Sequence, residues 1–255
     1  MISATEFRAR YANTVLGYVW TLLRPLIYFG VIFLIMRHVL RIGGNLKDYA
    51  FFLMLNIVLF QFFSETTARG VRSVVASEAM VRKVQFPRII IPLSVSLTAG
   101  YTLVLNLVAV FFIFIVFGVD PKWTWLLMPL IALLLFSFAT AVAMILSVLF
   151  VRWEDTGQVW DLIARALFFA SPILWPIERV PESYWWVVNL NPLALLLEQA
   201  RIWMIDPAAP GGFQAGAAAV AIPVVLLLAA CVFGLWLFDR EAPEVAEMGG
   251  MRRGR

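Results

Sequence analysis

The sequence predicts an all-α integral membrane protein with six transmembrane helices. Of its 255 residues, 62% are hydrophobic and 14% are charged, and the mean hydropathy is +0.89. A soluble domain is about half apolar and about a quarter charged, so this chain lacks the polar surface to cover a water-exposed globule. Helices are expected because an open sheet leaves backbone groups unpaired in lipid, and barrel strands would alternate in hydrophobicity.

Six apolar windows carry the predicted crossings, each of which takes about 20 residues. They cover residues 20–36, 49–63, 93–117, 123–150, 159–174 and 216–238. The second and fifth windows are short, so we expect those helices to be tilted, broken or partly buried against neighbours. The first window is not a cleavable signal peptide, because it contains Arg24 and Pro25 and lacks a small-residue cleavage site.

Both chain ends are expected in the cytoplasm. With six crossings the two ends share one side, and the connections on that side hold twelve Lys and Arg residues against six on the other. The positive-inside rule assigns the richer side to the cytoplasm. The predicted organisation is a cytoplasmic segment 1–18, a transmembrane domain 19–238 and a cytoplasmic tail 239–255, which we expect to be disordered.

The first segment predicts an amphipathic helix at the membrane interface. Within residues 1–18, four apolar or aromatic side chains recur at three- to four-residue spacing, which places them on one helix face: Phe7, Tyr11, Val15 and Tyr18.

Two further connections are more than turns. The cytoplasmic stretch 64–92 is long and basic, and Pro87 biases Phe86 away from helix, so a break there can redirect the chain into the third crossing. The outer stretch 171–213 holds six Pro and five Trp or Tyr residues. This composition predicts broken interfacial helices before the last crossing.

The sequence lacks the motifs that several kinds of chemistry require. No G-x-x-x-x-G-K-[ST] loop is present, so we do not expect this chain to hydrolyse ATP alone. The single Cys231 and the single His38 exclude a disulfide and a His/Cys metal site. The net charge of +4 could suggest nucleic-acid binding, but in a membrane protein the placement of Lys and Arg is first explained by the orientation of the helices. No cofactor, metal or nucleic acid is therefore expected on this chain.

An acidic group at the start of the fifth helix leaves two interpretations open. Glu154, Asp155 and Asp161 precede Arg165, and in a continuous helix Glu154, Asp161 and Arg165 share a face. Such carboxylates could hold Mg²⁺ in a membrane glycosyl- or phosphosugar-transferase. The other interpretation is a solvated helix start, where the helix dipole favours acids.

Arg24 and the aromatic side chains are the candidate contacts for a ligand. Arg24 lies about a turn inside the first window, where it either snorkels to the cytoplasmic face or contacts a lipid phosphate that enters from the cytoplasmic leaflet. Rings on which sugars pack are candidates for a glycan path, although each ring taken singly also fits lipid contact or packing: Tyr28, Phe29, Phe33, Phe168 and Phe169.

Three segments together resemble permease subunits of type-2 ABC exporters, in the O-antigen, polysaccharide and teichoic acid export family. They are RYANTVLGYVWTLLRP from Arg10, VRKVQFPRIIIPL from Val81, and RWEDTGQVWDL from Arg152 with SPILWP from Ser171 and NPL from Asn191. The order and spacing of these segments extend the resemblance over nearly the whole chain. Two departures are that Trp153 and Glu154 separate Arg152 from Asp155, and that the short carboxyl tail carries no glycan-binding domain.

The resemblance implies a homodimer of this chain in the bacterial plasma (inner) membrane, with two copies of a separate ABC ATPase subunit that binds ATP and Mg²⁺. The implied substrate is a glycan on a polyprenyl diphosphate carrier, such as an O-antigen or teichoic acid, moved from the cytoplasmic to the outer leaflet. The same fold with a drug or small lipid as cargo is one alternative, and the transferase is the other.

The resemblance also implies roles for two groups of residues. Those that fall on the interface helix are Arg8, Arg10 and Tyr11. Those that fall in the region for ATPase coupling and gating are Arg82, Lys83, Phe86, Pro87 and Arg88. The basic residues of the second group could meet an acidic ATPase surface or a lipid phosphate, or serve only as positive-inside anchors.

Overall fold

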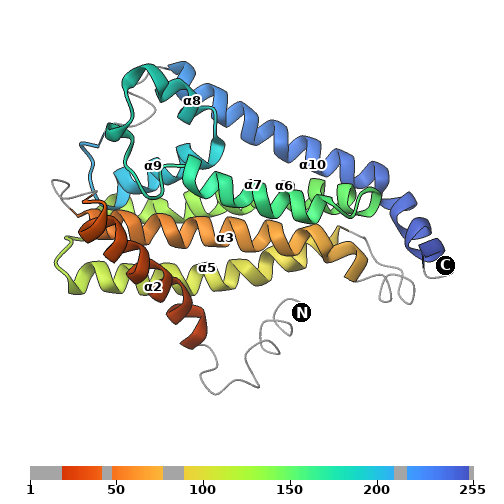
Figure 1. The fold of residues 1–255 in the computed structure, drawn as a ribbon, viewed down its shortest axis with the longest axis horizontal. Helices are drawn as coiled ribbons and strands as arrows, with labels where there is room; N and C mark the ends of the chain where they lie inside the picture. Colours follow the sequence, from red (N-terminus) through yellow and green to blue (C-terminus); the bar gives the residue numbers. More distant parts are fainter. Residues whose placement is uncertain (1–18, 42–47, 77–88, 210–216, 253–255) are drawn as a thin grey trace.

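The computed structural model describes residues 19–41, 48–76, 89–209 and 217–252. These residues form helices and connections, with no strand among them (Figure 1), which confirms the all-α class. The predicted interface helix at 1–18, with Arg8, Arg10 and Tyr11, lies outside the described residues. So does the predicted coupling group, which comprises Arg82, Lys83, Phe86, Pro87 and Arg88.

Among the described residues, five helical segments are long and apolar enough to cross a membrane: Val19–Val39, Tyr49–Ala76, Ile90–Val116, Trp123–Arg152 and Ala219–Glu241. They correspond to α2 (Val19–Leu34) with the π-helical η1 (Ile35–Val39), α3 (Tyr49–Ala76), α5 (Ile90–Val116), the 3₁₀ turn η2 (Trp123–Leu127) with α6 (Met128–Arg152), and α10 (Ala217–Arg252).

The expected fifth crossing is represented by a shorter helix. α7 (Thr156–Ala170) has 15 residues, fewer than the roughly 20 that span the hydrocarbon core. The backbone of Ser171 is extended, as expected of a residue before proline, so the helix ends ahead of Pro172. A sixth crossing therefore stays a prediction.

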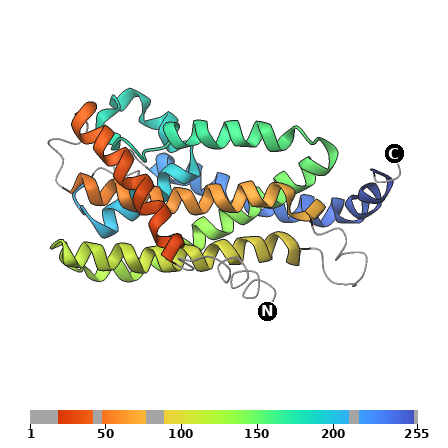
Figure 2. The same cartoon turned by 60° about the horizontal axis from the view of Figure 1, so that its bottom comes forward.

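α3 is the central helix. In both views it lies between α5 and α7 (Figures 1 and 2), and 72% of its most apolar window is buried. A helix that is apolar on all sides buries all of them against neighbours. The corresponding windows of α2 and α10 are 11% and 17% buried, so these two helices lie at the periphery and leave most of their apolar side chains uncovered by the rest of the chain.

The outer stretch breaks into short helices, as its prolines predict: η3 (Ile177–Arg179), η4 (Glu182–Tyr184), α8 (Trp185–Asn189) and α9 (Pro192–Met204). The side chain of Asn191 caps α9 by accepting a hydrogen bond from the backbone N–H of Leu193 at 3.0 Å. Two buried side chains of α3 hold the beginning of the stretch. The Tyr49 hydroxyl donates to the carbonyl of Leu174 at 2.7 Å, and Asn56 Nδ2 donates to the carbonyl of Pro172 at 3.1 Å.

The last helix extends beyond the predicted crossing. α10 continues to Arg252, so residues 239–252, for which the sequence predicted a disordered tail, are helical. Within this extension Glu241 forms an ion pair with Arg152 at the end of α6. Arg152 therefore pairs with an acid of α10, although Glu154 and Asp155 follow it directly in the chain.

Candidate functional site

A groove of about 800 Å³ lies between α2, α3 and α7. Each helix contributes one face to it. On α3 the lining residues recur at intervals of three and four, from Ile57 through Phe60, Gln61, Ser64, Glu65 and Ala68 to Arg69. On α7 they are Asp161, Ala164, Arg165, Phe168 and Phe169, and on α2 they are Arg24 and Tyr28. This spacing is the helical repeat that places side chains on a common face.

One end of the groove is aromatic and centred on Phe168. The ring of Phe168 lies 5.9 Å from that of Tyr28, 5.2 Å from that of Phe60 and 5.3 Å from that of Phe169. The Tyr28 contact joins α2 to α7 across α3. Phe168 is buried, whereas Phe169 is 65% exposed and Tyr28 is 48% exposed. The two exposed rings therefore offer faces for a ligand to stack on, and Phe168 supports them.

The other end of the groove is charged. Glu65 and Arg69 form an ion pair of 2.8 Å one turn apart on α3. The exposed side chains of Arg24, Asp161 and Arg165 line the same groove, each closer along its helix to the cytoplasmic end predicted from the sequence than Tyr28 or Phe168. Because Arg69 is near the end of α3 and Asp161 near the start of α7, the charged end lies toward the side that the sequence assigns to the cytoplasm. Its guanidinium groups are suited to phosphate or carboxylate.

Comparison with known proteins assigns the chain to a family. The model of the ABC-2 type transporter family matches residues 1–205, most of the chain. The protein belongs to the ABC-2 type transporter family.

Among its curated relatives are two O-antigen export system permease proteins named RfbA. The one from Klebsiella pneumoniae is 27% identical over 198 residues, which is 77% of this chain and 76% of that protein. The one from Myxococcus xanthus is 28% identical over 244 residues, 95% and 91% of the two chains. The polysialic acid transport protein KpsM of Escherichia coli is 24% identical over 203 residues, again 77% and 76%.

In this ABC-2 transporter, four of the six candidate ligand contacts lie together: Arg24, Tyr28, Phe168 and Phe169 all line the groove. Phe29 and Phe33 do not line it. Their rings stack on each other at 5.5 Å, and both are half-buried against the helix core. The groove also contains charged and polar side chains on α3 that the sequence did not single out. Their three- and four-residue spacing in the sequence could have indicated that they share one face of a helix.

The acidic residues proposed for a transferase are divided by the start of α7. Asp161 lies on this helix in the groove, whereas Glu154 and Asp155 precede Thr156, where the helix begins. The continuous helix that would place Glu154 on the face of Asp161 is therefore not formed. Within the described parts of the chain, no group of three or more His, Cys, Asp or Glu residues is placed to hold a metal ion.

A second charged cluster of the transporter lies in the outer stretch. Arg201 of α9 is 6% exposed, and Glu198, one turn earlier on the same helix, is 4% exposed. Arg201 pairs with Glu178 of η3, while both carboxylate oxygens of Glu198 are buried without a hydrogen-bond partner. Burial raises the pKa of Glu198 to about 8, with Arg201 opposing the shift and Glu178 adding to it. Glu198 therefore holds its proton at neutral pH.

Proposed function

We propose that this chain is the membrane-spanning permease of an ATP-driven exporter that moves a cell-envelope polysaccharide across the bacterial inner membrane. Membership of the ABC-2 family and relatives named for O-antigen and polysialic acid export support the cargo class. The proposed cargo is a glycan on a polyprenyl diphosphate carrier. It moves from the cytoplasmic to the outer leaflet, and both chain ends lie in the cytoplasm.

The two-ended groove is the observation that carries this proposal. At one end, the exposed rings of Tyr28 and Phe169 offer faces on which the C–H faces of sugars can pack. At the other end, Arg24 and Arg165 extend from different helices and match the charge of a diphosphate. A lipid-linked glycan combines both chemistries, because its phosphates adjoin its first sugar.

The proposed assembly is a homodimer of this chain with two copies of a separate ABC ATPase, which supplies ATP and Mg²⁺ binding. The sequence contains no phosphate-binding loop of its own. Arg82, Lys83, Phe86, Pro87 and Arg88 are proposed to receive the motion of the ATPase. Arg8, Arg10 and Tyr11 are proposed to anchor the interface helix in the cytoplasmic leaflet.

Depletion of the chain in its own organism tests the function. We expect surface polysaccharide to disappear while lipid-linked glycan accumulates on the cytoplasmic face, and we expect a plasmid copy of the gene to reverse both changes. A copy with Arg24→Glu, which places an anion where the phosphate is proposed to bind, is expected to reach the membrane without restoring export. Normal surface glycan after depletion, with no internal accumulation, would refute the proposal.

Assays on purified protein distinguish the two alternatives. ATP hydrolysis by the complex with its ATPase should rise with lipid-linked glycan. A response to drugs or small lipids in its place would indicate a different cargo. A Mg²⁺-dependent glycosyl- or phosphosugar-transfer product from the isolated chain would indicate a transferase that uses Asp161.

A further inference from the structure

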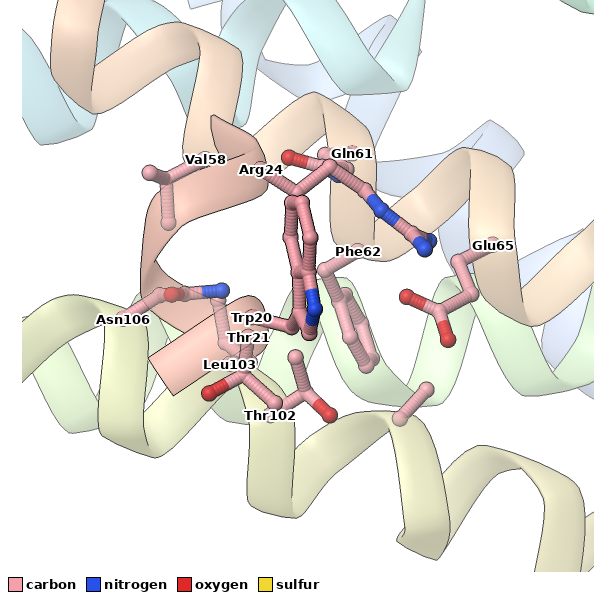
Figure 3. A pocket seen from close by; sticks show the side chains of 11 residues that line it. Trp20, Thr21, Arg24, Val58, Gln61, Phe62, Glu65, Thr102, Leu103 and Asn106 are labelled. Atoms are coloured by element: carbon pink, nitrogen blue, oxygen red, sulfur yellow. The ribbon is translucent and has the colours of Figure 1, made fainter. Parts of the chain in front are cut away.

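A second, smaller cavity lies where α2 crosses α3 and α5. It has a volume of about 30 Å³ and is partly open beside the exposed Trp20, and we call it the polar pocket. Figure 3 shows polar side chains from all three helices around it, among them Thr21 of α2, Gln61 of α3, and Thr102 and Asn106 of α5. The apolar side chains of Phe62 and Leu103 also line the pocket. This much polar surface between helices of a membrane domain requires hydrogen-bond partners.

Three oxygen atoms of the pocket have no such partner in the described part of the chain. They are Oε1 of Gln61, Oγ1 of Thr102 and Oδ1 of Asn106, each buried and without a hydrogen bond. Thr102 is 9% exposed and Asn106 is 7% exposed, so bulk solvent does not reach them. A buried acceptor that gains no donor on folding is destabilising, and native structures almost always supply one.

The size and chemistry of the pocket identify the missing donor. A water molecule needs about 10–15 Å³ of such space, so 30 Å³ holds one or two. Water can donate two hydrogen bonds and accept others, which suits a pocket lined by several acceptors. A metal cation is disfavoured because the one carboxylate among the described residues that border the pocket, Glu65, already pairs with Arg69, and Arg24, which also borders it, adds positive charge.

We propose that the polar pocket binds ordered water, and that this water fastens α2 to α3 and α5. α2 has two buried residues, Thr21 and Pro25, and Thr21 lines the pocket. The attachment of α2 at this point is thus hydrated rather than dry. Pro25 lacks an N–H for the helical hydrogen bond one turn back, so the helix bends readily beside the attachment. Because α2 also forms one wall of the groove, the water sets the position of that wall.

Radiolytic labelling detects such water directly. Brief X-ray exposure of the full-length chain in lipid nanodiscs generates hydroxyl radicals from water in place. We expect oxidation of Phe62 or Leu103, which line the pocket and are each 4% exposed. Leu53 on α3 is 0% exposed and lies away from the pocket, so it is the control that stays unmodified. Equal, background labelling of Leu103, Phe62 and Leu53 would overturn the proposal.

Two isosteric substitutions, which are expected to change Tm in opposite directions, give a second test. Thr66 on α3 is 0% exposed, its hydroxyl is also unpartnered, and it lies outside the pocket. Thr66→Val removes an orphaned group and should raise Tm. Thr102→Val removes a group that the water satisfies, and should lower Tm by about 2–4 °C. A Tm for Thr102→Val that is unchanged or raised would contradict a bound water.

The solution ions decide whether the occupant is a cation. Replacing Na⁺ and K⁺ by N-methyl-D-glucamine, which is too large for the pocket, should leave both the labelling and Tm unchanged. A Tm of the unmodified chain that rises with Na⁺ or K⁺, while that of Asn106→Leu does not, would overturn the assignment of water.

Discussion

The guanidinium of Arg201 donates two parallel hydrogen bonds to the carboxylate of Glu178, from Nη1 to Oε2 at 3.0 Å and from Nη2 to Oε1 at 2.7 Å. Its central carbon lies 5.2 Å from the centre of the Phe52 ring. The pair therefore joins η3 to α9 and places both against α3. Arg201 is the more deeply buried partner, with 8% of its side chain exposed against 33% for Glu178.

Removing the guanidinium should destabilise the outer stretch. Arg201→Met keeps the apolar stem but leaves Glu178 without its cation, beside the buried Glu198. Breaking a buried pair costs about 3–5 kcal/mol, and the partial exposure of Glu178 favours the lower end of that range. Thermal unfolding of the purified chain measures the loss. Arg179→Met, at the exposed last residue of η3, is the control and should stay within about 0.5 kcal/mol. Equal losses in the two variants would contradict the structural role of the pair.

Glu198 should make stability fall as pH rises. Its pKa is raised by burial from 4.5 to about 8, so between these values the folded chain keeps a proton that the unfolded chain releases. The free energy of unfolding therefore decreases from pH 4.5 upward and levels off above about pH 8. Glu198→Gln should abolish this slope, as measured by Tm across the range. A slope that persists in Glu198→Gln would assign it to another group.

Glu178 supplies a matched control with the opposite sign. Burial alone would raise its pKa, but the hydrogen bond from Arg201 and the charge of Arg201 outweigh burial, and the pKa is lowered below 4.5. Its contribution to stability is present above pH 4.5 and is lost as pH falls through the lowered pKa. Glu178→Gln should therefore alter the acid limb. Because the charge of Glu178 adds to the raised pKa of Glu198, the same variant should end the slope above pH 4.5 at a lower pH without removing it.

Hydropathy predicted the lipid-facing parts of the fold better than the parts that carry the groove. The window 49–63 ended where polar residues begin, yet α3 continues to Ala76. Its extension is stabilised by packing and by the Glu65–Arg69 pair, neither of which raises hydropathy. The tail from 239 is also helical, and its Glu241 pairs with Arg152, a contact that hydropathy does not register.

The candidate site was predictable by residue type but not by helix face. Tyr28 and Phe29 are neighbours in the sequence, and successive residues of a helix point about 100° apart. Tyr28 lines the groove, while Phe29 packs with Phe33 against the core. Which side of α2 faces α7 depends on the docking of three helices, and the apolar pattern of a lipid-exposed helix does not encode it.

Two glycines should resist substitution because helices approach closely there. A Cβ on Gly70 of α3 would collide with Ala143 of α6, whose Cα would lie at 3.0 Å. A Cβ on Gly234 of α10 would lie 2.8 Å from the carbonyl oxygen of Ala141. We expect Gly70→Ala and Gly234→Ala to cost about 1–3 kcal/mol each in thermal unfolding. Gly30→Ala on α2, where a Cβ meets nothing within 4 Å, should be tolerated, and an equal loss there would refute the packing argument.

The proposed coupling group can be tested on the assembled complex. Lys83→Glu reverses a charge that would face the ATPase, and Pro87→Ala restores a backbone N–H and removes the predicted break in the chain. We expect the double variant to insert normally but to lower substrate-stimulated ATP hydrolysis. Arg41→Glu reverses an exposed charge in a connection predicted on the opposite side of the membrane and should leave hydrolysis unchanged. Full transport and full stimulation in the double variant would remove these residues from the coupling role.

At the aromatic end of the groove, a substitution should change transport without changing the stability of the fold. Phe169 is 65% exposed in the groove, and Phe112 on α5 is 68% exposed but outside it. Truncating either exposed ring to Ala should change unfolding by no more than about 0.5 kcal/mol. Loss of a stacking contact of 0.5–1.5 kcal/mol corresponds to roughly a two- to tenfold change, so we expect Phe169→Ala alone to reduce surface polysaccharide by that factor. Quantified surface glycan at matched protein levels provides the measurement. Equal export by the two variants would mean that the ring at position 169 contacts lipid, not cargo, and would move the glycan path out of this groove.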